Sequence, residues 1–161
     1  MISVAAGSVV RVVPAEVDLL GLSPESANIP SLLAILLCDQ IILEQGNGKK
    51  TLVGVFDDLW SPAEPIAQKI GFFARMTDLE GNYRFAIKVV RIAAEGEIVV
   101  ASGDIPVEQP VTDRLANLDL ALNLPPTVFP RFGKYEFQLF SNDMYIGRAV
   151  LNCRKLEAAN K

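Results

Sequence analysis

Along much of the chain, apolar and polar positions alternate with a period of two, which is the spacing of a β-strand that buries one face. The clearest case is residues 83–92, whose expected inward positions are Tyr83, Phe85, Ile87 and Val89. Two consecutive valines, Val89 and Val90, then break the phase and indicate a bulge or the end of the strand. Residues 135–140 and 144–156 alternate in the same way, on either side of a hairpin connection.

Residues 32–44 are apolar apart from Asp39, Gln40 and the final Glu44, a pattern that predicts a strand buried on both faces. A helix is the competing interpretation, because leucine and alanine are good helix formers. The glycine- and asparagine-rich stretch at 46–50 is typical of a hairpin, and the apolar and β-branched residues 51–56 follow it directly. This neighbouring hairpin favours the strand.

The remaining segments complete the pattern. Residues 67–77 predict a strand with one apolar face, made of Ile70, Phe72, Ala74 and Met76, and residues 97–105 predict another strand. Residues 78–82 indicate a hairpin turn. The alternate leucines of residues 115–124 favour a strand next to a sheet edge over a short helix, and the proline-containing stretch 57–66 is expected to be irregular.

These elements predict an all-β domain of the immunoglobulin-like antiparallel β-sandwich type, with about seven to nine strands. A C2-like or jelly-roll strand order stays open. Tyr135 follows a turn at 129–134 and opens the penultimate strand. This arrangement resembles the tyrosine corner of immunoglobulin-like domains, in which the hydroxyl bonds to upstream backbone. The other interpretation of Tyr135 is an aromatic residue at a strand start.

Residues 1–30 carry many turn signals and are expected to form an N-terminal extension, while residues 31–157 form the domain. Within the extension, the valine-rich stretch 9–13 is a candidate strand. We expect the extension to dock on the domain or on a neighbouring subunit rather than to form a second domain.

The composition excludes several classes of function. The net charge of −4 and the scattered basic residues exclude the basic surface that nucleic-acid binding needs. Half of the residues are hydrophobic, enough to leave apolar surface for a partner. The chain has no histidine, which removes Ser–His–Asp and Cys–His catalysis and histidine-based zinc sites.

The two cysteines, Cys38 and Cys153, lie in apolar stretches and are expected to be buried thiols, although a disulfide between their strands is conceivable. The N-terminus lacks the pattern of a secretory signal. The apolar run 32–43 is too short to span a membrane and contains an aspartate. We therefore expect a cytoplasmic protein without a membrane span.

Three segments resemble a bacterial family of small proteins known only as a domain of unknown function. They are LLCDQII at 36–42, TLVGVFD at 51–57, and the stretch 129–137 with its Gly133 and Tyr135. The resemblance covers residues 33–156 and implies a compact β-sandwich found as a stand-alone chain. It implies no activity, cofactor or catalytic residue.

Candidate site residues are few. Asp57 and Asp58, followed by the aromatic Trp60, are expected in a loop where they could bind a partner or a calcium ion. Their alternative role is hydrogen bonding within a turn. Asp39, if buried, would need hydrogen-bond donors or a raised pKa. The stretch at 78–82 matches a calcium-binding loop poorly.

The leading hypothesis is a non-catalytic binding or assembly module that acts through protein–protein contacts, including self-association, and needs no cofactor. A calcium-responsive, C2-like module using Asp57, Asp58 and Asp78 is the alternative. A hydrolase without histidine is the third hypothesis, and no pattern in the sequence favours an enzyme.

Overall fold

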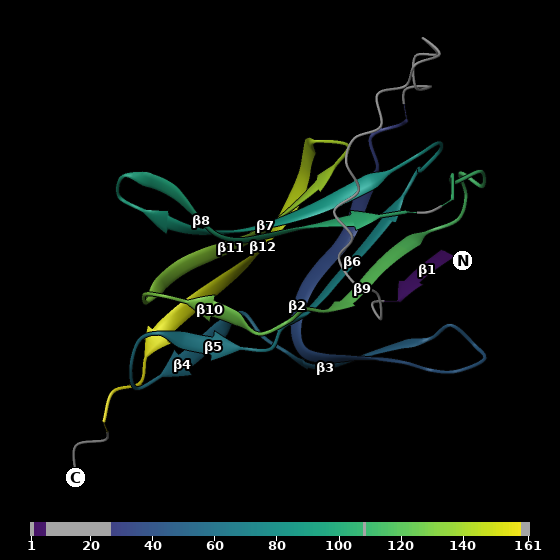
Figure 1. Cartoon of the computed structure of the whole chain (residues 1–161). Helices are drawn as coiled ribbons and strands as arrows, with labels where there is room; N and C mark the ends of the chain where they lie inside the picture. Colours follow the sequence, from purple (N-terminus) through teal and green to yellow (C-terminus); the bar gives the residue numbers. More distant parts are fainter. Residues whose placement is uncertain (1, 6–26, 108, 159–161) are drawn as a thin grey trace.

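The computed structural model describes residues 2–5, 27–107 and 109–158, and all regular elements in these ranges are β-strands (Figure 1). Sheet A has the strand order β1 (Ile2–Ala5), β9 (Leu118–Asn123), β6 (Gly71–Thr77), β2 (Ser31–Leu43) and β3 (Lys50–Val55). Sheet B has the order β4 (Asp58–Ser61), β12 (Met144–Lys155), β11 (Gly133–Ser141), β7 (Arg84–Ala93) and β8 (Gly96–Pro106). A small third sheet pairs β10 (Thr127–Phe129) with β5 (Ile66–Gln68).

The all-β prediction is confirmed, but the sheets are mixed rather than purely antiparallel. Strand β1 pairs in parallel with β9, and β4 pairs in parallel with β12. The described residues form twelve strands, more than expected, because β1, β4, β5 and β10 have only three or four residues each and show no alternation in the sequence. The described part of the chain contains no helix that could cross a membrane.

One apolar core lies between sheets A and B, built from the alternate positions that the sequence indicates. Sheet A contributes Leu37, Phe72, Ala74, Met76, Leu118, Leu120 and Leu122. Sheet B contributes Phe85, Ile87, Val89, Tyr135, Phe137, Leu139, Ala149, Leu151 and Cys153. The predicted change of phase in β7 is a register shift between Val89 and Val90. Strand β9 lies second from the edge of sheet A, as its alternate leucines predict.

Strand β2 differs from its prediction. It is a strand and not a helix, but burial on both faces is wrong, because Leu33, Leu36 and Ile42 are at least 40 % exposed. Its first half pairs with β6, and its second half pairs with β3 instead. The second half and β3 form a hairpin that reaches β9, where the backbone of Ile41 bonds the side chain of Asn123.

Two connections were also mispredicted. Residues 78–82 do not form a hairpin turn, since they carry the chain from β6 in sheet A to β7 in sheet B. Residues 57–66 are not wholly irregular, because they contain β4, which forms the edge of sheet B. Both errors concern which sheet a strand joins, and local sequence does not encode that choice. The candidate strand at 9–13 lies outside the described residues.

Two buried tyrosines fix the chain where it enters sheet B. The hydroxyl of Tyr135 donates to the carbonyl of Arg131 at 2.6 Å and accepts from its N–H at 3.2 Å, which confirms the tyrosine corner. Tyr83 acts similarly, since its hydroxyl contacts the carbonyl of Asn28 at 2.8 Å and accepts from the N–H of Glu80. Each tyrosine thus satisfies backbone groups that the core would otherwise leave unpaired.

Tyr135→Phe should lower the free energy of unfolding by about 1–2 kcal/mol, because it leaves both backbone groups of Arg131 without their partner. Urea denaturation measures the change. The control is Tyr145→Phe, since Tyr145 is half exposed and its hydroxyl bonds no described residue. Equal losses in the two variants would contradict a structural role for the Tyr135 hydroxyl.

Candidate functional site

The predicted residues Asp58 and Trp60 lie on β4, at the edge of sheet B, and share one partner. The Nε of Arg154 donates to Oδ1 of Asp58 at 2.7 Å, and the guanidinium lies 5.6 Å from the centre of the Trp60 ring. The hydrogen bond from Arg154 lowers the pKa of Asp58. This cluster holds β4 against β12 and leaves the indole 58 % exposed.

The calcium hypothesis requires Asp57, Asp58 and Asp78 to meet, and the structure separates them. Asp57 follows β3, whose Val55 lies opposite Cys38 of β2. Asp78 follows β6, whose Thr77 lies opposite Ser31 at the start of β2, seven residues before Cys38. Among the described residues, no three His, Cys, Asp or Glu side chains are arranged to hold a metal ion. The carboxylates therefore do not form one calcium site.

Asp39, the other predicted acid, is exposed rather than buried. It lies beside Gly54, where a side chain would collide with its carboxylate. The two cysteines are buried and unbonded, as expected. Burial raises the pKa of both thiols, that of Cys153 to about 11, so both are protonated at neutral pH and are poor nucleophiles.

One side of the molecule exposes the edges of both sheets. Strand β4 pairs only with Asn152–Lys155 of β12, so residues 144–151 have a ladder partner on the β11 side alone among the described residues. In sheet A, β3 pairs with β2 from Cys38 onward, and, among the described residues, 31–36 pair with β6 alone.

A groove of about 460 Å³ lies between these two edges. Its lining is mostly apolar, with a charge of each sign: Ile35, Leu36, Leu37, Val55, Phe56, Asp57, Arg148, Ala149 and Val150. Val55 is 56 % exposed and Leu36 is 40 % exposed. Of the three predicted site residues, Asp57 lines this groove, whereas Asp58 and Trp60 do not.

The backbone of β12 points hydrogen-bonding groups into this open edge. The N–H of Asn152 points away from β11, because it donates to the carbonyl of Asp57 at 2.8 Å. Backbone groups alternate in direction along a strand, so those of Val150 and Arg148 point to the same side. No described residue bonds them. The edge therefore presents donors and acceptors at the spacing of a β-ladder.

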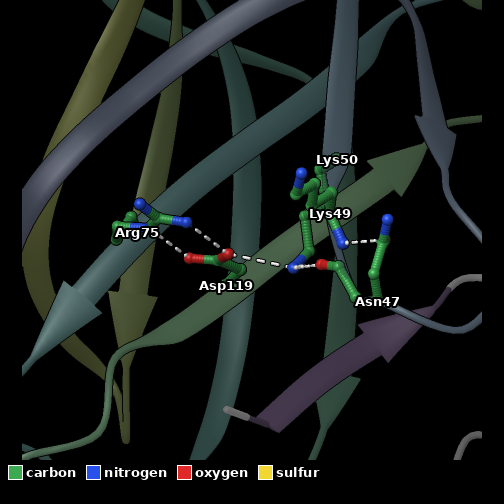
Figure 2. A network of polar contacts seen from close by, with 6 residues as sticks. Asn47, Lys49, Lys50, Arg75 and Asp119 are labelled. Atoms are coloured by element: carbon green, nitrogen blue, oxygen red, sulfur yellow. Dashed lines mark hydrogen bonds and ion pairs between the residues drawn. The ribbon is translucent and has the colours of Figure 1, made fainter.

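A buried ion cluster on the outer face of sheet A was not predicted. Asp119 on β9 is 1 % exposed and bonds Arg75 on β6, at 2.7 and 2.9 Å, and the Nζ of Lys50 on β3, at 3.0 Å (Figure 2). We call these three residues the triad. Burial alone would raise the pKa of Asp119, but the hydrogen bonds from Arg75 and Lys50 outweigh it and hold the pKa below its ordinary value.

The sequence contained one signal for the triad. Asp119 lies between Leu118 and Leu120 on a strand whose leucines face the core, so it must face outward. Nothing local indicates that Lys50 and Arg75 meet it there, since they are 69 and 44 residues away in the chain.

Asp119→Asn should lower the free energy of unfolding by about 3 kcal/mol at neutral pH, because it leaves the 5 % exposed side chain of Lys50 charged and uncompensated. Since the pKa of Asp119 is lower in the folded state, its stabilisation is present above the ordinary value of 3.8 and is lost as the pH falls through the folded value.

The difference in the free energy of unfolding between the parent and Asp119→Asn should therefore disappear in acid. Denaturation curves from pH 7 downward test this, with Asp143→Asn as the control. Asp143 pairs with Arg84 at the surface, where an ion pair contributes little. A difference in the free energy of unfolding that stays constant with pH would contradict the stabilising role of the charged Asp119.

Comparison with known proteins identifies a family but no activity. The protein-family model described as "Family of unknown function (DUF6941)" matches residues 33–154, and the chain belongs to this family. The search of curated proteins returns no match.

Proposed function

We propose that this member of the DUF6941 family is a non-catalytic binding or assembly module that acts through protein–protein contacts, with a second copy of the chain as its first partner. The partner adds a strand to the open edge of β12. The supporting observation is that the backbone groups of Arg148 and Val150 face this edge, which has no ladder partner among the described residues.

An extended partner strand suits this edge for two reasons. It satisfies the backbone groups of β12 by β-augmentation, in which main-chain hydrogen bonds supply affinity. It also covers exposed apolar side chains beside the groove, including Leu36 and Val55, together with Met144 at the far end of the open stretch. Unprotected edges of this kind pair readily with other chains.

A second copy is the partner that needs no further assumption. Two identical strands can pair antiparallel about a two-fold axis, and each then satisfies the same groups on the other. The open stretch, residues 144–151, is longer than a typical strand needs to be. Arg148 and the neighbouring Asp57 add polar contacts at the rim of the interface.

The proposal that the module is not an enzyme and uses no cofactor rests on its side chains. The sequence has no histidine to act as a general base. Both thiols are protonated at neutral pH, because burial raises their pKa values. The buried carboxylate of Asp119 is neutralised by two cations.

Three finer assignments belong to the same proposal. The architecture is an immunoglobulin-like sandwich, supported by the tyrosine corner and by connections such as β6–β7 that pass between the sheets. The protein works in a reducing compartment such as the cytoplasm, which suits two unbonded buried cysteines. Residues 1–30 are an extension of the 31–157 domain, and β1 of this extension pairs with β9.

Val150→Pro should convert a dimer into a monomer without unfolding the domain. Proline removes the N–H of Val150, which faces the open edge and not β11, so the internal ladder keeps its bonds. Multi-angle light scattering over a range of concentrations measures the mass, and circular dichroism checks the fold. Val150→Thr, which keeps both the N–H and the β-branched shape, should behave like the parent.

A chain truncated before Ser31 separates this interface from one made by the N-terminal extension. It should remain dimeric if the edge of β12 carries association. A parent protein that is monomeric at all concentrations, or a Val150→Pro dimer as stable as the parent dimer, would overturn the proposal.

A further inference from the structure

The hairpin formed by the end of β2 and by β3 crosses the outer face of sheet A, in the lower part of Figure 1. Beneath it lies a second apolar cluster, separate from the main core. Its buried members are Cys38, Ile41, Phe73 and Ala121, and Ala34 and Leu52 pack against them. The hairpin thus covers apolar side chains that the core between the sheets does not include.

Few contacts hold the hairpin on this face. The N–H of Ile41 donates to the Asn123 side chain at 2.9 Å, and the Asn123 amide donates back to the carbonyl of Ile41 at 2.9 Å. Among the described residues, the other polar contact is the bond between Lys50 and Asp119 in the triad (Figure 2). The residues between these anchors, 42–49, are all exposed. Segments with so few buried contacts are those that open locally.

Packing under the hairpin is also incomplete. A hollow of about 430 Å³ separates part of the hairpin from β6, and it is lined by Leu52 and Lys50 on one side and by Phe73 and Arg75 on the other. Because this hollow is open to solvent, the hairpin gains less from dispersion there than the closely packed main core does.

The base of the hairpin contains a place to bend. Gly54 adopts a φ of +65°, which interrupts the regular conformation of β3 beside Asp39. A side chain there would collide with the Asp39 carboxylate. Glycine accepts such a backbone readily and lets the chain turn between the hairpin and residues 55–57, which lead to β4.

We propose that residues 39–54 form a flap that opens from the outer face of sheet A while the rest of the domain stays folded, and that the triad is its latch. Opening uncovers Phe73 and Ala121 and separates Lys50 from Asp119. The surface so exposed is distinct from the β12 edge. The flap therefore makes an apolar face of the protein conditional on two polar anchors, of which the triad is the charged one, independently of self-association.

The two cysteines report on this motion, because one lies under the flap and the other in the main core. Cys38 is fully buried, with its Sγ against Gly71 beneath Ile41, and Cys153 is 2 % exposed between the sheets. Two full-length single-thiol proteins are needed. Cys153→Ala keeps Cys38, and Cys38→Ala keeps Cys153.

The experiment measures the rate of reaction with Ellman's reagent in urea below the global transition, divided by the rate of the same thiol in the unfolded chain. Cys38 should react at least about tenfold faster than Cys153 and with a shallower dependence on urea, because local opening exposes less surface than unfolding. Equal normalised rates and slopes for the two thiols would show that the hairpin opens only with the whole domain, and would overturn the proposal.

Variants of the latch test its role. Asp119→Asn should raise the rate of Cys38 about tenfold or more while its urea slope stays shallow. Lys50→Met removes the same bond from the hairpin side, keeps an apolar stem of similar length, and should act in the same direction. Asp143→Asn, at an exposed ion pair, should leave both thiols unchanged. If neither latch variant raises the rate of Cys38, the triad is not the latch.

Discussion

The fold depends on one constraint, that the inner faces of sheets A and B must bury their apolar side chains against each other. In the described part of the chain, twenty-two buried residues share this core; most come from strands of sheets A and B, and the others from the small third sheet and the connections. Each of these strands can satisfy the constraint only by alternating its side chains, because successive residues point to opposite faces. The outer faces are then free to carry polar groups such as Asp119, Arg75, Glu136 and Arg148.

The same constraint explains how far the sequence predicts the structure. Where the large apolar side chains of a strand lie on one face, as in β7, β9, β11 and β12, the alternation identifies the inward residues correctly. It fails for β2, because its apolar residues serve two surfaces: Leu37 packs in the main core, while Ile41 packs in the second cluster on the opposite face of sheet A. A continuous apolar run looks the same whether it is buried on both faces or bends from one surface to another.

The triad and the open edge of β12 were harder to predict than the fold, since both of these sites depend on strand order. Residue types alone could single out Asp57, Asp58 and Trp60. Only the pairing of β4 with β12 places Asp58 and Trp60 beside Arg154 while Asp57 lines the groove. The triad joins three strands that are distant in sequence, and the β12 edge is open because β4 is short. Such features arise from the meeting of separate segments, and no local pattern records them.

Strand β2 connects the two surfaces that we propose to be functional. Its first half lies beside the groove next to β12, and its second half belongs to the flap. The carbonyl of Leu37, at the boundary, accepts from the N–H of Phe56 at 3.1 Å, where the chain leaves β3 for β4. Val55 and Phe56, which line the groove, directly follow the flap in the chain and join it to the edge next to β12.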